Sequence, residues 1–317
     1  MEKEGRFEGC FSVTVWVRRF ARGRNRDAWL QIWLAAAFFG VVFLLASSAT
    51  APACTLWAAA GERTAGGGAI VAKNRDWTPE ADEVRLAGFK NGRRFLGLFP
   101  VRDGKRPSAV AGISEKGLVF VTATAGSVPQ AEREKGGTGL AGKVLSEFTS
   151  VGEVLENRAL FSQTHPSIYL IADRRRIAWI EVAPDGRVAV RTTDSGSLCH
   201  TNHYLDDELK SSNTRIGRSS AGRLDRIQQL LDTGPPRLTP EDFIAFSRDI
   251  HAGPDDSIWR TGGKAGRERT LATWIVSLPM DAPPEIFIRL ANPGESEKTM
   301  RMPLDSPFWK RQNATIF

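Results

Sequence analysis

The sequence predicts an α+β protein in which antiparallel sheets are covered by helices. Three observations lead to this fold class. Short strand-like stretches gather toward both ends of residues 54–317, and helical patterns lie between them. The regular alternation of strands and helices that builds a parallel sheet is missing. No internal repeat or low-complexity segment interrupts this part of the chain.

The predicted strands are short apolar stretches separated by turns that contain Gly, Lys, Asp or Pro. The first two strands flank a glycine-rich turn at 61–68, so they form a hairpin. The last two flank the prolines at 279, 283 and 284 and close the predicted fold. The full set of predicted strands is 55–60, 69–72, 84–89, 94–99, 109–113, 118–123, 167–172, 177–182, 187–191, 270–278 and 285–290.

Four helices are predicted, at 140–148, 151–160, 219–231 and 242–251. In the third helix, apolar residues share one face. They are Leu224, Ile227, Leu230 and Leu231. The fourth helix is opened by Thr239 and Pro240, since threonine is a good N-cap and proline suits a first helical turn.

Residues 1–53 have the pattern of an export signal. Several arginines precede an apolar run at 29–46, and Ala51-Pro52-Ala53 gives an A-x-A cleavage site. A cut after Ala53 makes Cys54 the first residue of the mature chain and leaves 54–317 as one domain. Two alternatives stay open: the apolar run is long enough for an uncleaved membrane anchor, and a cysteine after the cut also suits a lipoprotein.

Composition excludes some classes of function. The net charge of the full chain is +7, part of it from the signal, and no basic run follows residue 53, so there is no indication of a nucleic-acid partner. Only Cys54 and Cys199 remain after the cut, too few for a disulfide framework, although one bridge between them is possible.

Cys54 is the first candidate catalytic residue, because a terminal cysteine carries a thiol nucleophile and an amine base together. The predicted hairpin brings residues 73–77 (KNRDW) back beside it. Asp76 could then anchor the α-amino group, and the cation of Lys73 would favour the thiolate. The alternative is a surface turn with solvated charges.

Four segments in order along the chain resemble motifs of one enzyme family. They are residues 73–77 (KNRDW), 114–118 (SEKGL), 200–203 (HTNH) and 219–224 (SSAGRL). Together with Cys54 they resemble the N-terminal-nucleophile hydrolases of the choloylglycine hydrolase and penicillin V acylase type. The chain is most similar to their acyltransferase branch of isopenicillin-N acyltransferase-like proteins, in which the first motif is K-N-R-D-W.

The resemblance implies a four-layer αββα sandwich with two antiparallel sheets, and a catalytic domain that cleaves linear amide bonds. It implies these roles: Cys54 is the nucleophile, Asp76 orients its amine, Asn202 and the backbone N–H of Thr124 form the oxyanion hole, and Arg223 lines the active site. Lys73 stands where the bile-salt branch has arginine, so the charge is kept but the bidentate fork is lost. Thr124 replaces the family's usual Asn or Tyr, which a backbone donor tolerates.

Other signals are weaker. Residues 137–143 (GTGLAGK) fit a nucleotide-binding loop, but Val144 replaces its Ser or Thr, so a loop beside the substrate pocket is favoured. His200 and His203 are spaced like metal ligands without a third partner, so neither a metal nor a cofactor is predicted. Trp57 and Trp77 flank the site and could bind substrate, with core packing as the alternative.

The sequence therefore predicts an exported cysteine amidohydrolase, periplasmic or extracellular, that acts on an N-acylated small molecule through a thioester. Its only contact with the membrane is the signal segment before cleavage. An acyltransferase that passes the acyl group to an amine is one alternative. A non-catalytic envelope protein, membrane-anchored or lipidated on Cys54, is another. The resemblance leaves a homo-oligomer open, because homotetramers occur in the family.

Overall fold

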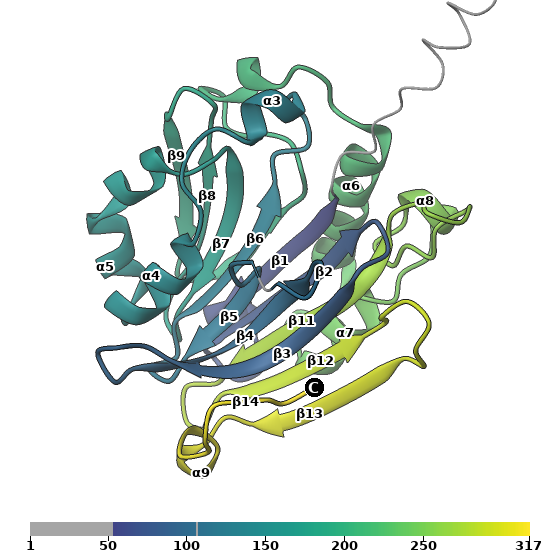
Figure 1. Cartoon of the computed structure of the whole chain (residues 1–317). Helices are drawn as coiled ribbons and strands as arrows, with labels where there is room; N and C mark the ends of the chain where they lie inside the picture. Colours follow the sequence, from purple (N-terminus) through teal and green to yellow (C-terminus); the bar gives the residue numbers. More distant parts are fainter. Residues whose placement is uncertain (1–52, 106) are drawn as a thin grey trace, which may run out of the picture. The chain divides into compact units, whose positions relative to one another are not determined.

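Two antiparallel sheets lie face to face at the centre of the computed structural model, which describes residues 53–105 and 107–317 (Figure 1). The six-stranded sheet has the order β10-β1-β2-β11-β12-β13. Its strands are β1 Cys54–Ala60, β2 Ala69–Trp77, β10 Gly196–His200, β11 Arg269–Leu278, β12 Glu285–Leu290 and β13 Lys298–Pro303. All its neighbouring strands are antiparallel.

The eight-stranded sheet has the order β14-β3-β4-β5-β6-β7-β8-β9 and is also antiparallel. Its strands are β3 Ala81–Gly88, β4 Arg94–Val101, β5 Ala111–Ser114, β6 Val119–Thr124, β7 Ser167–Ala172, β8 Ile177–Val182, β9 Val188–Thr193 and β14 Ala314–Thr315. Hairpins and short turns connect most of these strands, so they are close in sequence as well as in space.

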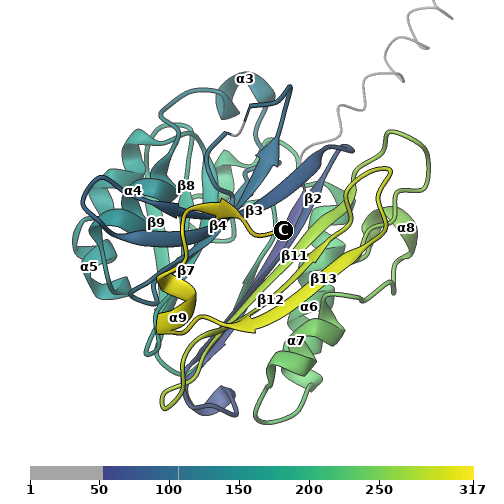
Figure 2. The same cartoon turned by 60° about the horizontal axis from the view of Figure 1, so that its bottom comes forward.

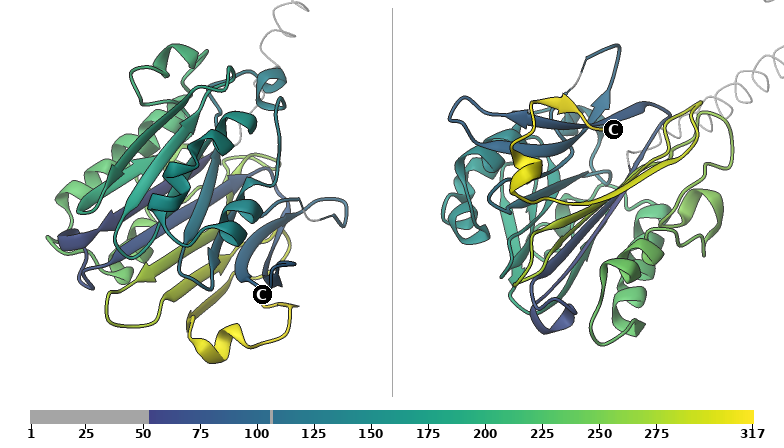
Figure 3. Two further views of the ribbon diagram at one scale, coloured as in Figure 1. Left: turned by 90° about the vertical axis from the view of Figure 1, so that its left-hand side faces the viewer. Right: turned by 90° about the horizontal axis from the view of Figure 1, so that it is seen from below.

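Helices cover the outer face of each sheet (Figures 1 and 3). The helices α4 Leu140–Glu147 and α5 Val151–Glu156, with the short η2 Arg158–Gln163, share an apolar cluster with the eight-stranded sheet. The helices α6 Arg218–Thr233 and α7 Pro240–Phe246 share another with the six-stranded sheet. A third cluster joins the inner faces of both sheets. These three clusters separate four layers, which confirms the predicted αββα sandwich.

The predicted strands and helices all occur, and the errors concern short or polar elements. Five short helical segments and three strands have no counterpart in the prediction: η1 Gly61–Arg63, α3 Gln130–Arg133, η3 Lys210–Ser212, α8 Gly253–Asp256, α9 Ser306–Trp309, β10, β13 and β14. The expectation that the chain closes with 285–290 is wrong, because β13 and α9 Ser306–Trp309 follow. The strand β13 is a largely exposed edge strand whose alternation is short: only Met300 and Met302 turn toward the core, between exposed residues, so its strand signal is weak.

The helix predicted at 242–251 is shorter than expected and ends at Phe246. Its start is as predicted: Thr239 and Asp242 form a capping box, with Pro240 in the first turn. At its end, Asn74 on β2 donates a hydrogen bond of 2.9 Å to the carbonyl of Ser247. The Ser247 carbonyl, just after the last helical residue, thus has its hydrogen bond from a distant strand instead of from the next helical turn.

In the described part of the chain, no helix is both long and apolar enough to cross a membrane. The predicted signal segment and its apolar run lie outside the described residues.

Residues 53–317 belong to one compact unit. Figure 2 shows the C-terminal strand β14 joining the edge of the eight-stranded sheet beside β3.

Candidate active site

The hairpin of β1 and β2 brings the predicted catalytic residues together. Cys54 is the first residue of β1, and its partner in the register is Arg75, while Leu56 pairs with Lys73. Side chains on a strand alternate between the two faces of a sheet, and directly paired residues share a face. Cys54, Lys73 and Arg75 therefore all point toward the eight-stranded sheet.

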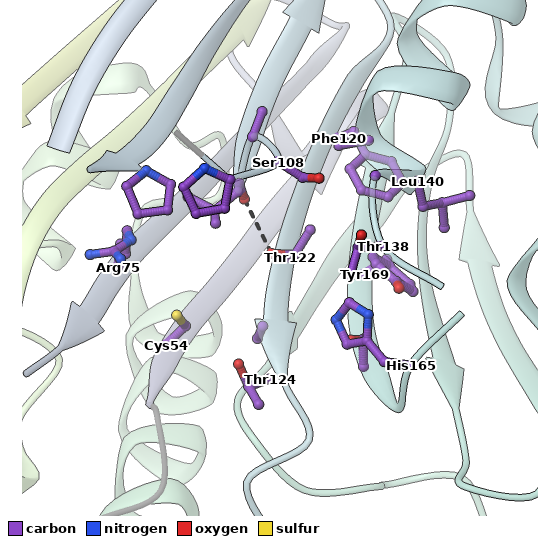
Figure 4. A pocket seen from close by; sticks show the side chains of 18 of the residues that line it. Cys54, Arg75, Ser108, Phe120, Thr122, Thr124, Thr138, Leu140, His165 and Tyr169 are labelled. Carbon is purple, nitrogen blue, oxygen red and sulfur yellow. Dashed lines mark hydrogen bonds between the residues drawn. The ribbon is translucent and has the colours of Figure 1, made fainter. Parts of the chain in front are cut away.

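A cavity of about 440 Å³ opens in front of the Cys54 side chain (Figure 4). The six-stranded sheet supplies Cys54, Lys73, Arg75 and Trp77 to its lining. The opposite wall consists of Pro100 at the end of β4, Arg102, the segment 107–110 and the β6 residues Phe120, Thr122, Ala123 and Thr124. The rest of the lining comes from Thr138, Gly139, Leu140, Ala141, His165, Ser167 and Tyr169. The predicted pocket role of the glycine-containing loop at 137–143 is thus supported by its position: Gly139, at φ 86°, turns the chain into α4 against the cavity.

Lys73 is buried beside the thiol. Its Nζ donates a hydrogen bond to the carbonyl of Thr122 on the opposite sheet. Burial lowers the pKa of Lys73. The Cys54 side chain raises this pKa, both through its charge and through a hydrogen bond with Lys73. The predicted contact between this cation and the thiol is therefore present.

Asn202 and Arg223 hold the main chain of Cys54 from behind the cavity. The backbone N–H of Cys54 donates to Oδ1 of Asn202 at 2.8 Å, and Nη1 of Arg223 donates to the Cys54 carbonyl at 2.6 Å. Arg223 also donates to Oδ1 of Asn202 at 3.0 Å. The Nδ2 group of Asn202 donates to the carbonyl of Thr124, which lines the cavity. The backbone nitrogen and carbonyl oxygen of Cys54 are thus fixed by partners far away in the sequence.

The helix α6 positions Arg223 because its buried stripe changes from polar to apolar along its length. The buried residues of this stripe follow one another at intervals of about one helical turn: Ser220 and Arg223 come first, then Ile227 and Leu231. The apolar half packs against the sheet, and the polar half meets the active site. Arg223 thus lies in the candidate active site through its contacts with Cys54 and Asn202, but it is not part of the cavity lining.

Asp76 lies buried between two arginines. Its Oδ2 atom is 3.9 Å from Nη1 of Arg223 and 3.9 Å from Nη1 of Arg260. Thr270 donates a hydrogen bond of 2.8 Å to Oδ1, but Oδ2 has no hydrogen-bond partner among the described residues. Burial raises the pKa of Asp76 to about 6, although Arg223 and Arg260 pull it down.

The backbone of Asp76 also contacts the peptide bond that the predicted cut would break. Its N–H donates a hydrogen bond of 3.0 Å to the carbonyl of Ala53. Ala53 and Cys54 are each only 5% exposed, so this peptide bond is enclosed by the fold. The backbone of Asp76 therefore lies beside the Ala53–Cys54 peptide bond, and its carboxylate lies 3.9 Å from the same Nη1 of Arg223 that binds the Cys54 carbonyl.

The structure adds charged residues that the sequence analysis did not assign to the site. Arg75 and Arg102 line the cavity. Arg260 and its ion-pair partner Glu268, whose atoms are 2.7 Å apart, lie behind Asp76. Arg75 had a usable signal, because it stands two residues after Lys73 on the same face of a strand. Arg102, Arg260 and Glu268 lie in turns and loops whose sequence gives no such signal.

Trp57 does not bind substrate from the cavity wall, which corrects the prediction. It is fully buried on the helix side of the sheet, with its ring centroid 6.1 Å from that of Phe243. Trp57 is three residues after Cys54, so the alternation along the strand turns it to the opposite face. Trp77 does line the cavity, as expected of a pocket residue.

The remaining candidates have structural surroundings. His200 is buried, and its Nε2 lies 2.6 Å from Oε1 of Glu181. Nδ1 of His203 lies 2.8 Å from Oγ of Ser220. Burial lowers the pKa of His203 to about 4. No group of three metal-binding side chains occurs in the described residues. Cys54 and Cys199 are both free thiols, so the alternative of a bridge between them is not realised.

Comparisons with known proteins give the family and the fold of the chain. Residues 63–295 match the sequence family described as "Acyl-coenzyme A:6-aminopenicillanic acid acyl-transferase". A variant of conjugated bile acid hydrolase from Clostridium perfringens has 13% identity and a TM-score of 0.55 over 83% of this chain and 96% of its own. Penicillin V acylase from Agrobacterium tumefaciens has 16% identity and a TM-score of 0.50 over 80% and 89%. No match was found among curated proteins.

At these identities the two solved structures show a shared fold. Together with the family match, they confirm the resemblance and the fold class predicted from the sequence.

Proposed function

Because the chain belongs to the acyl-coenzyme A:6-aminopenicillanic acid acyl-transferase family, we propose that it is a cysteine amidohydrolase of the N-terminal-nucleophile type. Its substrate is an N-acylated small molecule with a linear amide bond, and Cys54 is the nucleophile. One observation carries this proposal: the Cys54 side chain lines the cavity, while Asp76, whose Oδ2 has no hydrogen-bond partner among the described residues, binds the Ala53 carbonyl through its backbone N–H.

The enzyme becomes active when the bond between Ala53 and Cys54 is cut. The nitrogen of Cys54 then changes from a peptide group with one hydrogen to a primary amine. It keeps Oδ1 of Asn202 as an acceptor at 2.8 Å. Its additional hydrogens can reach Oδ2 of Asp76, which satisfies the buried carboxylate oxygen. Asp76 thereby fixes the direction of the amine lone pair.

In the first chemical step, the α-amine of Cys54 takes the thiol proton and the thiolate sulfur attacks the carbonyl carbon of the substrate. Lys73 stabilises the negative sulfur, because its ammonium group lies beside the thiol. The negative charge moves to the carbonyl oxygen. Nδ2 of Asn202 and the backbone N–H of Thr124 donate hydrogen bonds to this oxygen, each contributing about 3 kcal/mol in a well-aligned site.

In the second step, the α-ammonium returns its proton to the leaving nitrogen, the C–N bond breaks and a thioester forms on Cys54. A water molecule then attacks the thioester, the amine again acts as base, and the carboxylic acid leaves. An amine that replaces this water yields a new amide. Acyl transfer is therefore the second candidate function, and the description of the matched family favours it.

The proposal includes export: residues 1–53 act as a signal that is removed after Ala53, and the enzyme works in the periplasm or outside the cell. A non-catalytic, lipidated envelope protein is disfavoured by the burial of Cys54, which is 5% exposed at the bottom of a cavity. A lipid on this thiol would have to fill the cavity or unfold the start of β1.

The test begins with the N-terminus. Intact mass and N-terminal sequencing of the purified protein are expected to show an unmodified chain that starts at Cys54. A retained N-terminal segment or a lipid on the thiol would exclude the proposed mechanism.

The same preparation is then assayed for amide cleavage on acyl-amino acids, acyl-homoserine lactones, penicillins and conjugated bile acids, with and without an added acceptor amine. Turnover is expected to disappear in Cys54→Ala and to persist in the control Cys199→Ala. Cleavage that survives in Cys54→Ala means that the assigned nucleophile is wrong. Product formation that requires the acceptor amine identifies a transferase.

A further inference from the structure

Glu181 is a buried acidic residue to which the proposed mechanism assigns no role. It lies on β8, where all six residues are buried, and its side chain is 0% exposed. Taking a carboxylate out of water is costly unless other hydrogen bonds replace the lost water. The partners of this carboxylate therefore indicate what it does in the fold.

The Glu181 carboxylate binds one short segment, residues 200–206, at both of its ends. Oε1 lies 2.6 Å from Nε2 of His200, the last residue of β10, and accepts a hydrogen bond of 2.6 Å from the backbone N–H of Leu205. Oε2 accepts a hydrogen bond of 3.2 Å from the backbone N–H of Asp206. Since β8 and β10 belong to different sheets, one side chain ties this segment to the opposite sheet.

This segment is a buried loop, so its backbone groups depend on partners from outside. Residues 201–204 are at most 7% exposed and form neither a helix nor a strand. A buried N–H or C=O group without a partner is unfavourable, and a loop has no ladder that supplies one. Asn213 takes part of this role, because its Oδ1 accepts a hydrogen bond of 2.9 Å from the N–H of Tyr204. Glu181 serves both ends of the loop with a charge, and hydrogen bonds to charged acceptors are the stronger ones.

Asn202 stands inside this loop and presents its amide to the active site. Its Oδ1 atom accepts hydrogen bonds from Cys54 and Arg223, and one hydrogen of Nδ2 goes to the Thr124 carbonyl at 2.8 Å. Among the described residues, Nδ2 has no second acceptor. The proposed mechanism directs its remaining hydrogen at the oxyanion. The direction of this hydrogen depends on where the loop holds the Asn202 backbone.

We propose that Glu181 is a positioning residue of the oxyanion hole: its carboxylate holds both ends of the loop 200–206 and thereby places Nδ2 of Asn202 against the reacting carbonyl oxygen. This inference rests on the proposed function, in which Asn202 is an oxyanion donor. Glu181 does not line the cavity, so it acts through the loop and not on the substrate. A small shift of the loop should weaken the transition state more than substrate binding, because the oxyanion forms only after the attack.

Glu181→Gln tests this role, because it keeps the size of the side chain but leaves one acceptor oxygen for three donors. The purified full chain and its variants are assayed with N-octanoyl-glycine, N-octanoyl-homoserine lactone, penicillin V and glycocholate, and the probe that the wild type cleaves fastest is used for the kinetics. We expect kcat to fall about 10- to 100-fold, as for a catalytic group displaced by about 1 Å, and KM to change less than about 2-fold.

Asp207→Asn is the matched control. Asp207 follows the loop directly, its side chain is 93% exposed, and it pairs with Lys210. Its loss should leave kcat and KM unchanged. An unchanged kcat in Glu181→Gln, or an equal loss in Asp207→Asn, contradicts the proposed role of Glu181.

A background of Asn202→Ala separates positioning from general support of the fold. If Glu181 acts through Asn202, Glu181→Gln should lower kcat less than about 3-fold further once residue 202 has lost its amide. The same fold-loss in both backgrounds overturns the proposal, because a purely structural carboxylate would act independently of Asn202.

His200 provides a second pair of variants for the case that Glu181→Gln does not yield folded protein. The glutamine amide places an N–H near the position of Nε2, so His200→Gln keeps a donor for Glu181, whereas His200→Leu removes it. We expect kcat to be about 10-fold lower in His200→Leu than in His200→Gln. Equal kcat values in the two variants contradict the proposal.

Hydrogen exchange tells failure of this inference apart from failure of the proposed function. Backbone exchange of the loop 200–206, measured by mass spectrometry, should be faster in Glu181→Gln or His200→Leu than in the wild type, with β12 as an unaffected reference. If the wild type cleaves none of the four probes, faster exchange confined to the loop supports the hold of Glu181 on it while the amidohydrolase proposal fails. Unchanged exchange in the loop, or an equal rise in β12, overturns the role of Glu181 as well.

Discussion

The two faces of the hairpin β1–β2 differ in chemistry although they share one backbone. The inner face presents Cys54, Lys73 and Arg75 to a cavity. The outer face carries Asn74 and Asp76, which are fully buried against helices and loops. In the proposed mechanism, the inner face holds the groups that meet a substrate, and the outer face holds the groups that fix the backbone of Cys54.

The two cysteines show the same contrast. Cys54 lines the cavity between the sheets, whereas Cys199 pairs with Trp57 in the register, belongs to the cluster under α6 and α7 and lines a separate hollow of about 600 Å³. Burial raises the pKa of Cys199 to about 12, and its Sγ donates to Gln228. Burial therefore disfavours the thiolate of Cys199, whereas Cys54 is the proposed nucleophile.

The largest effect is expected on the outer face, from Asp76→Asn. An amide can still bind Thr270, but it does not attract the α-ammonium of Cys54, so kcat/KM should fall about 10²- to 10⁴-fold. Steady-state amide cleavage measures this, with intact mass to show that the variant starts at Cys54. Thr270→Val, which removes only the hydrogen bond to Oδ1, is the milder control. A correctly processed Asp76→Asn enzyme with normal turnover would remove Asp76 from the mechanism.

Arg260 is expected to act through Asp76. Its charge lowers the pKa of that carboxyl, so its removal raises the pKa and a higher pH is needed to ionise Asp76. Arg260→Gln should therefore move the acid limb of the kcat/KM profile to higher pH and lower kcat/KM about 10-fold at neutral pH. Arg260→Lys should restore most of the profile, because it keeps the charge. An unshifted acid limb with a uniform loss would indicate a structural role only.

The two tryptophans test the division between the faces directly. Trp57→Ala leaves a hole beside Phe243 and should lower the free energy of unfolding by about 3–5 kcal/mol. Trp77→Ala should change stability less and raise KM, because this ring lines the cavity and packs under Arg75 and Arg102. Chemical denaturation and steady-state kinetics on both variants give the comparison. If Trp57→Ala raises KM and Trp77→Ala does not, the two faces of the hairpin do not separate structural from substrate-binding roles.

The smallest effect is expected at Cys199. Iodoacetamide should add one group to the native protein, at Cys54, and abolish turnover in parallel, while Cys199 remains unmodified until the protein is denatured. Peptide mapping by mass spectrometry locates the modified thiol. Rapid native modification of Cys199 would show that the cluster under α6 opens more readily than its burial indicates.

Much of the hairpin could be predicted from the sequence, because a strand has a local period of two. Lys73 and Asp76 were placed near Cys54 by the turn at 61–68 alone, and the structure brings them there. The same period would have turned Trp57 away from the cavity, since it is an odd number of residues from Cys54. The strand period thus predicts the face on which Trp57 lies, whereas Arg260 lies in a loop where no period predicts its contact with Asp76.

Taken alone, the sequence determined the α+β class and the family and supplied Cys54 as the proposed nucleophile, since these depend on local periodicity and on motifs of a few residues. Only the tertiary structure decided that Arg223 reaches the Cys54 carbonyl from 169 residues away, that Arg260 flanks Asp76, and that two arginines line the cavity. These contacts form where the outer helices and the second sheet pack against the hairpin. Packing between layers joins residues that no sequence period relates, so it becomes visible only in the folded chain.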